Sequence, residues 1–301
     1  MEQQLNTPIL FLIFNRPDTT KKVFESISKA KPKRLYIAAD GPRMDRPAEQ
    51  EVCLKTREIV NMIDWPCEVK TLFREKNLGC KIAVSSAINW FFENEEEGII
   101  LEDDCLPVQS FYVFCQTLLS KYRTDESVMH IGGCNVFNQS DSSDDYSFIS
   151  YPLIWGWATW RRAWKKYDVN MTTYSEVKKT GRLKDIFPKI GTRNFWENVF
   201  NKVVRNVVNT WDYQWSYAVL MNDGLCIVPT KNLVQNLGFT EEATHTSGKK
   251  DPRSELQLFH LNGELKHPAS TKIDMAWNNL LEKKYFSFSF IQRVALKLKK
   301  A

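Results

Sequence analysis

"GIILEDDCLP" (residues 98–107) joins an apolar run to three consecutive acids, Glu102, Asp103 and Asp104. A short apolar run of this kind is typical of a strand buried on both faces. Three neighbouring carboxylates repel one another unless a positive charge lies beside them. The stretch therefore predicts a buried strand that ends at a cation.

The residues before this stretch alternate between strand-like and helix-like patterns. Continuous apolar runs predict strands, whereas apolar residues three or four positions apart predict helices. The predicted strands cover residues 8–14, 34–40 and 68–74, and the predicted helices begin near Pro17 and cover residues 46–62 and 79–92. This alternation is typical of a doubly wound α/β domain with a mostly parallel sheet.

Polar residues follow each of the four predicted strands. Asn15 and Arg16 follow the first, Asp40 the second and Arg74 the third, and the acids at 102–104 follow the fourth. Ligands of such sheets bind outside the carboxyl ends of the strands. We therefore expect these side chains to converge on one edge, although polar residues are also common wherever a strand ends.

The composition excludes several classes of protein. The chain has 301 residues, 43% of them hydrophobic, and a net charge of +5, which gives little reason to expect a nucleic-acid partner. Its seven cysteines form no C-x-x-C pair, which favours a reducing compartment. No window approaches the roughly 18 apolar residues of a membrane span, and the N-terminus does not resemble a signal peptide. These features predict a cytoplasmic protein.

A divalent metal ion is the cation that we expect beside the acidic triplet. Carboxylate oxygens suit Mg²⁺ or Mn²⁺, whose remaining positions are commonly filled by substrate phosphates. Neither a G-x-G-x-x-G nor a G-x-x-x-x-G-K-[ST] motif is present. A nucleotide diphosphate would therefore be held by the metal and by side chains such as Arg16.

Four short motifs, "IFNRP", "AADGP", "NLGCK" and "ILEDD", occur in this order. Together they resemble the metal-dependent GT-A glycosyltransferases, nearest to the N-acetylglucosaminyltransferases that begin complex N-glycan branches and their bacterial relatives. The resemblance implies a GT-A type (Rossmann-like) fold in a single large domain. It also implies roles for particular residues: Asp104 as the metal ligand, Glu102 and Asp103 at the ribose or sugar of the donor, Arg16 at the diphosphate, Asp40 at the uracil ring, and Lys81 in the donor pocket. Asn15, beside Arg16, is a further donor-binding candidate.

Four tryptophans crowd the segment "YPLIWGWATWRRAWKKYD" (151–168). Such density is usual for a core, but indole rings also stack on the C–H faces of sugars. Trp155 and Trp157 flank Gly156 and are the expected ligand contacts. Trp160 and Trp164 have helical i, i+4 spacing and are expected to pack.

The segment "NTWDYQWSYAVLMNDG" (209–224) predicts an apolar helix with Asp212 in its first turn. One interpretation is that Asp212 only complements the helix dipole. The other is that it is the general base that deprotonates a sugar hydroxyl. The resembling family carries a W-D pair here, whose aspartate is the base of an inverting displacement.

Two polar segments are further candidates. Residues 138–150 are rich in turn-forming residues and are expected to form a lid. Residues 238–252 contain His245, a candidate ligand of the metal or diphosphate, with Lys249 and Lys250 as weaker phosphate contacts.

The last residues differ in character from the rest. Residues 283–301 contain six Lys or Arg residues and no acid after Lys283, and the pattern predicts an amphipathic helix. Docking on the domain is one interpretation, and binding to an anionic membrane surface is the preferred one. The predicted organisation is a nucleotide-sugar-binding half (1–137), an acceptor-binding half (138–270) and a basic amphipathic tail (271–301).

These observations predict an inverting, metal-dependent glycosyltransferase. It would use a nucleotide-sugar donor, Mn²⁺ or Mg²⁺, and a glycan or lipid-linked glycan acceptor at the inner face of a membrane. A nucleotidyltransferase of similar fold and a non-enzymatic glycan-binding protein remain alternatives.

Overall fold

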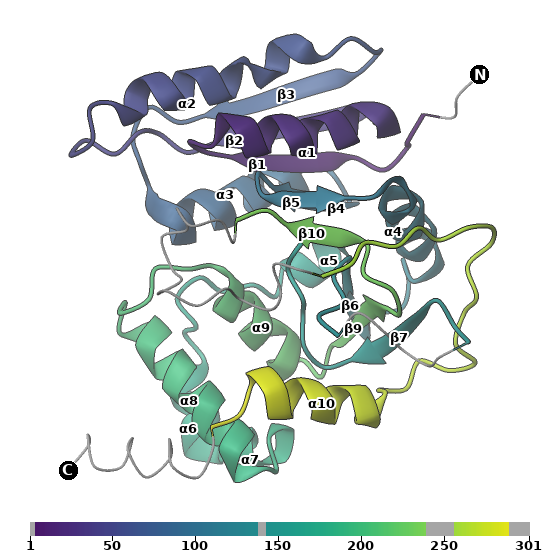
Figure 1. The fold of residues 1–301 in the computed structure, drawn as a ribbon. Helices are drawn as coiled ribbons and strands as arrows, with labels where there is room; N and C mark the ends of the chain where they lie inside the picture. Colours follow the sequence, from purple (N-terminus) through teal and green to yellow (C-terminus); the bar gives the residue numbers. More distant parts are fainter. Residues whose placement is uncertain (1–3, 138–142, 239–255, 289–301) are drawn as a thin grey trace.

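The computed structural model describes residues 4–137, 143–238 and 256–288. Its centre is one eight-stranded sheet in the order β3-β2-β1-β4-β8-β6-β9-β7 (Figure 1). The strands are β1 (Ile9–Ile13), β2 (Arg34–Ala39), β3 (Glu68–Phe73), β4 (Glu97–Glu102), β6 (Val128–Gly132), β7 (Tyr146–Ile149), β8 (Trp157–Trp160) and β9 (Leu225–Pro229). The first four are parallel, and β8 and β7 run antiparallel to their neighbours. A separate antiparallel pair joins β5 (Cys105–Pro107) to β10 (Val234–Asn236).

Helices cover both faces of the sheet (Figure 1). They are α1 (Pro17–Ala30), α2 (Glu49–Arg57), the 3₁₀ helix η1 (Glu58–Met62), α3 (Gly79–Asn94), α4 (Gln109–Lys121), α5 (Arg161–Trp164), α6 (Tyr174–Thr180), α7 (Arg182–Ile186), α8 (Ile190–Val204), α9 (Asp212–Met221) and α10 (Met275–Tyr285).

Strand β1 explains why the sheet has two cores. Its alternate side chains point to opposite faces. Ile9 and Phe11 pack with α1 and α4, whereas Leu10 and Leu12 pack with α3, α8 and α9. Because both faces are covered, the whole strand is buried and its sequence is continuously apolar.

The structure confirms the predicted fold class: a mixed α/β domain with a mostly parallel sheet flanked by helices, consistent with a GT-A type fold. Both predicted halves contribute strands to the one sheet, since β7, β8 and β9 come from the second half. Two local predictions were wrong. Part of the expected lid forms strand β7, and Trp160 ends β8 while Trp164 ends α5, so the two tryptophans do not share a helix.

Helix α10 lies in the segment predicted as the tail and docks on the body of the molecule. Trp277 and Leu281 belong to one of the two cores, and Asn278 accepts a hydrogen bond from the backbone N–H of Ser150 at 2.9 Å. The amphipathic pattern beyond residue 288 lies outside the described residues. Among the helices that the structure describes, none combines the length and apolar character needed to cross a bilayer.

Candidate active site

The carboxyl ends of β1, β2 and β4 meet at one edge of the sheet. Ile13 pairs with Ala39, and Leu12 pairs with Glu102. The residues that follow these strands are therefore neighbours, as the sequence predicted. Arg16, from the turn after β1, contacts the triplet directly.

Arg16 is the positive charge beside the acidic triplet in this structure. Its Nη1 lies 2.8 Å from Asp104 Oδ2 and 3.4 Å from Asp103 Oδ1. The guanidinium of Arg16 thus offsets part of the repulsion among the carboxylates. The sequence had led us to expect that a metal ion would do so. One guanidinium cannot balance three carboxylates, so excess negative charge remains at this edge.

The pKa values of two of the three acids are raised, partly because of this excess negative charge. Burial and the charge of Asp104 raise the pKa of Asp103 to about 7, despite the opposing effects of Arg16 and of the Phe14 N–H. Burial, followed by the charges of Asp104, Asp103 and Asp212, raises the pKa of Glu102 well above its usual range. No described residue forms a hydrogen bond or ion pair with the Glu102 carboxylate, which makes it the uncompensated acid of the triplet.

Asp104 is held from the opposite side by the chain that leaves β10. The backbone N–H of Leu237 donates to the carbonyl of Asp104 at 2.7 Å. A Cβ at Gly238 would collide with the Asp104 carboxylate, which would have to shift to make room. The β5–β10 pair therefore positions the acid that the resemblance assigns to the metal.

The residues present suit a hard divalent cation. The donors are carboxylate oxygens, and the cluster carries more negative charge than Arg16 balances. Within the described ranges, no three His, Cys, Asp or Glu side chains are already arranged around one point. This is compatible with Mg²⁺ or Mn²⁺, which commonly take one or two protein carboxylates and complete their shell with phosphate and water.

Asp40 binds backbone and amide groups of the protein itself, and its expected role at a uracil ring stays a prediction. Its carboxylate accepts hydrogen bonds from the backbone N–H groups of Gly41, Leu78 and Gly79 and from the Asn77 amide, at 2.9 to 3.2 Å. The side chain is buried, at 9% exposure. Asp40 therefore positions the start of α3, whose first N–H groups have no partner within the helix.

Asn15 and Arg43 meet at a second buried acid, Glu49. The Asn15 amide donates to Glu49 Oε1 at 2.8 Å, and Arg43 forms an ion pair with the same carboxylate. Hydrogen bonds from Arg43 lower the pKa of Glu49 in spite of its burial. Glu49 was not a candidate, because a single acid in a predicted helix carries no signal of this contact.

The start of α3 also orients Lys81 and Cys80. Lys81 Nζ donates to Asn206 at 3.1 Å, and among the described residues it forms no ion pair with the triplet. The expected donor-pocket role of Lys81 stays a prediction. Cys80, which sequence reasoning missed, is partly open to solvent, but desolvation by the surrounding protein, followed by the charges of Glu102 and Asp212, raises the pKa of its thiol to about 12. Its thiol stays protonated at the carboxylate edge.

Asp212 begins α9 on the opposite side of this edge. Its carboxylate accepts a hydrogen bond from the Thr210 hydroxyl. Burial raises its pKa, although hydrogen bonds from Thr210 and from two backbone N–H groups oppose this shift. A raised pKa makes the carboxylate a stronger base for a hydroxyl proton.

A cavity of about 190 Å³ lies beside Asp212 and includes Trp155. Its other walls are largely apolar and come from distant parts of the chain, including Leu153, Ile154 and Phe286. This cavity is called the acceptor cavity below. It brings together the predicted base and one predicted sugar contact.

Trp157 is not a ligand contact, contrary to our expectation. It is fully buried in β8, with His130 and Trp211 stacked on it at centroid distances of 5.2 and 5.6 Å. Gly156 separates the two tryptophans at φ 63°, a left-handed conformation that glycine adopts without strain. The turn directs Trp155 to the acceptor cavity, whereas Trp157 joins the core. Trp160 and Trp164 pack as predicted.

His245, Lys249 and Lys250 lie outside the described residues, so their predicted contacts stay predictions.

The sequence matches no protein-family model and no curated protein. Three solved structures have a similar arrangement. HddC from Yersinia pseudotuberculosis is 9% identical over 54% of this chain and 80% of that chain, with a TM-score of 0.35. S. aureus TarS 1–349 is 10% identical over 77% and 60%, with a TM-score of 0.45. A UDP-glucose pyrophosphorylase complexed with UDP-glucose is 10% identical over 76% and 92%, with a TM-score of 0.39. The functional argument therefore rests on the side chains of the site.

Proposed function

We propose that this chain is an inverting, metal-dependent glycosyltransferase. It transfers a sugar from a nucleotide diphosphate donor, UDP in particular, to a hydroxyl of a glycan or lipid-linked glycan acceptor. One observation carries the proposal. An acidic cluster with excess negative charge faces a separate, basic carboxylate at the carboxyl edge of the sheet, and the latter lines a cavity with an indole wall.

The acidic cluster supplies the donor side of the site. Asp104 would hold Mn²⁺ or Mg²⁺, with His245 as a second ligand, and Glu102 and Asp103 would bind the sugar or ribose of the donor. Bound there, the cation would act as a Lewis acid that stabilises negative charge on the departing diphosphate. Arg16 lies beside Asp104 and would bind the same diphosphate, because a guanidinium matches phosphate oxygens in a bidentate manner.

Asp212 supplies the acceptor side. It would take the proton from an acceptor hydroxyl as that oxygen attacks the anomeric carbon. Attack opposite to the leaving diphosphate inverts the anomeric configuration, through a transition state with oxocarbenium character. Trp155 would stack on the acceptor sugar and hold its hydroxyl near the base.

The basic C-terminal segment completes the proposal. We propose that it attracts the enzyme to an anionic membrane surface, near lipid-linked acceptors. Each basic residue close to such a surface contributes about 1 kcal/mol.

Isothermal titration with UDP, with and without Mn²⁺, tests the donor side. The wild type should bind UDP only with Mn²⁺ present, and Asp104→Asn should weaken that binding at least tenfold. Asp45→Asn, a change at an exposed aspartate, is the matched control and should bind as the wild type does. UDP binding that ignores both Mn²⁺ and Asp104→Asn would overturn the proposal.

Release of UDP from a panel of UDP sugars, and of GDP from a panel of GDP sugars, tests the reaction. Asp212→Asn should bind UDP normally and reduce transfer at least a hundredfold, because general-base catalysis contributes about 10²–10⁴-fold. A nucleotidyltransferase would instead form the nucleotide sugar from a nucleoside triphosphate and a sugar phosphate. A glycan-binding protein would bind sugars without turnover.

A further inference from the structure

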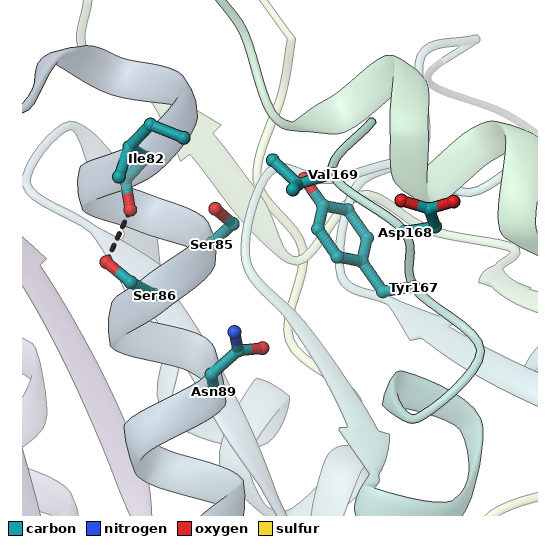
Figure 2. Close-up of a pocket in the computed structure, with 7 residues that line it drawn as sticks. All are labelled: Ile82, Ser85, Ser86, Asn89, Tyr167, Asp168 and Val169. Carbon is teal, nitrogen blue, oxygen red and sulfur yellow. Dashed lines mark hydrogen bonds between the residues drawn. The ribbon is translucent and has the colours of Figure 1, made fainter. Parts of the chain in front are cut away.

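A second cavity, of about 360 Å³, lies between α3 and the chain that follows α5 (Figure 2). Ile82, Ser85 and Asn89 line it from α3, and Tyr167, Asp168 and Val169 line it from the other side. We call it the α3 cavity. Its volume falls in the range of roughly 300–1,000 Å³ that is usual for small-molecule sites.

Tyr167 connects the α3 cavity to the candidate active site. Its hydroxyl donates to the carbonyl of Trp211 at 3.2 Å, and the next residue is Asp212. Burial raises the pKa of Tyr167, as do the charge of Asp212 and the neighbouring Cys80. Tyr167 thus joins the wall of the α3 cavity to the segment that precedes the proposed base.

The hydrogen-bonding groups of the α3 cavity have fixed orientations. Asn89 Oδ1 accepts a hydrogen bond from the Trp164 indole at 2.7 Å, and no described residue accepts from its NH₂ group. The Ser85 hydroxyl donates to the Lys81 carbonyl at 2.6 Å, and its oxygen, which also has a hydrogen-bonding contact with Tyr167, is the acceptor on this face. The cavity therefore offers a donor and an acceptor from one face of α3.

Asp168 adds a carboxylate whose position is also fixed. Its oxygens accept hydrogen bonds from Thr172 and from the Asn170 N–H. Burial alone would raise the pKa of Asp168, but these bonds outweigh it and lower the pKa. The acid is ionised at neutral pH and can accept further hydroxyl groups.

These walls favour a neutral sugar over other ligands. Hydroxyl groups around a pyranose ring would meet Asn89, Ser85 and Asp168, and the C–H faces of the ring would meet the side chains of Ile82 and Val169. No Lys or Arg lines the described cavity, and Asp168 would repel an anion, which disfavours a phosphate. The number of polar groups disfavours a purely apolar ligand.

We propose that the α3 cavity binds a neutral sugar residue of the acceptor, beyond the residue whose hydroxyl reacts at Asp212. This inference rests on the proposed function and extends it: the acceptor is an oligosaccharide of at least two sugars rather than a monosaccharide. Asn89, Ser85 and Asp168 bind the additional sugar, and Ile82 packs against its ring.

An array of neutral mono-, di- and trisaccharides, probed with the protein plus UDP and Mn²⁺, tests this inference. The wild type should bind at least one oligosaccharide tenfold more tightly than its constituent monosaccharides. Ile82→Trp, which fills the cavity from an exposed position, should abolish that preference. Asn89→Asp, which keeps the acceptor for Trp164 but removes the free NH₂ donors, should reduce it about fivefold.

Val113→Trp, at an exposed position on α4, is the matched control and should bind as the wild type does. Unchanged oligosaccharide binding by Ile82→Trp, or no oligosaccharide preference in the wild type, would overturn the inference. Mn²⁺-dependent UDP binding is measured on the same samples. If it persists in either case, the proposed function stands without the α3 cavity, and if the wild type lacks it, the proposed function itself fails.

Discussion

Glu102 lies in an environment that disfavours its charged form, because of desolvation and the charges of Asp104 and Asp103. Two acids neighbour it in the sequence, and Arg16 contacts those acids but not Glu102. A buried charge without a partner lowers stability, and such residues persist where a ligand supplies the missing charge. Glu102 should therefore contribute to binding at the expense of stability.

Replacing Glu102 with Gln should separate these two effects. The pKa of Glu102 is higher in the folded than in the unfolded chain, so its effect on stability is least unfavourable at low pH and worsens as pH rises. At pH 8, Glu102→Gln should raise the free energy of unfolding by about 1 kcal/mol or more, which corresponds to a rise of a few degrees in the melting temperature. At pH 4 the melting temperature should change little. Donor binding should fall at least tenfold.

Glu93→Gln, at an exposed position of α3, is the control for the charge change itself. A lower melting temperature for Glu102→Gln at pH 8 would mean that the carboxylate has a stabilising partner.

A substitution at Gly238 tests the position of Asp104 without removing any carboxylate. Gly238→Ala would introduce a Cβ that collides with the Asp104 carboxylate. We expect Mn²⁺-dependent UDP binding to weaken at least tenfold by calorimetry, because small displacements of a positioned group are costly. UDP binding equal to that of the wild type would show that Asp104 can move without loss.

Helix α3 depends at its first turn on a residue from another element. Asp40 follows β2, yet its carboxylate binds the N–H groups of Leu78 and Gly79. This contact fixes the start of α3 beside the loop that follows β2. Helix N-termini also favour a negative charge, which adds to the stabilisation.

Asp40→Ala should therefore act as a stability mutation. Buried donors left without a partner cost about 1–3 kcal/mol each, so we expect a loss of at least 2 kcal/mol in urea unfolding, with or without UDP. Asp45→Ala, at an exposed site in the same loop, should lose less than 0.5 kcal/mol. If Asp40→Ala has normal stability and loses only its selectivity for uracil, the result would instead support the contact with the uracil ring that the resemblance implies.

The helices and strands that could be predicted from the sequence are those whose apolar pattern follows directly from their burial. Strands β1, β2 and β4 and helices α1 and α3 show continuous or periodic apolar residues, because the layers of one domain cover them. Strand β3 lies at the edge of the sheet and is only partly buried. Strand β7 was missed, since "YSFI" follows a run of Ser and Asp that resembles a loop. The Arg16 ion pairs and the capping by Asp40 depend on contacts between distant segments, which no local pattern records.

At the scale of the whole molecule, an aromatic cluster around His130 joins the sheet to α9. The Trp215 indole N–H donates to His130 Nδ1 at 3.2 Å, so Nε2 carries the proton and donates to the Leu153 carbonyl at 3.1 Å. Burial lowers the pKa of His130 to about 3. The imidazole is therefore neutral in the folded protein.

This histidine should make the fold sensitive to acid. Its pKa is lower in the folded than in the unfolded chain, so its contribution is complete above pH 6.5 and is lost as pH falls toward 3, by about 1.4 kcal/mol per pH unit. His130→Gln should flatten the decline in unfolding free energy over this range. His260→Gln, at an exposed site, should keep the wild-type slope. Equal slopes in all three proteins would exclude His130 as the cause.

The acceptor cavity receives one of its walls from the far end of the chain. Phe286 lines it directly, and Glu282 of α10 accepts a hydrogen bond from Tyr151, another lining residue, at 2.9 Å. During synthesis on a ribosome, the strands and loops of the acidic cluster emerge long before residue 286. Under the proposed function, a chain without α10 would lack this wall of the acceptor cavity, so water could replace the acceptor as the nucleophile. Productive transfer would then require that α10 is in place.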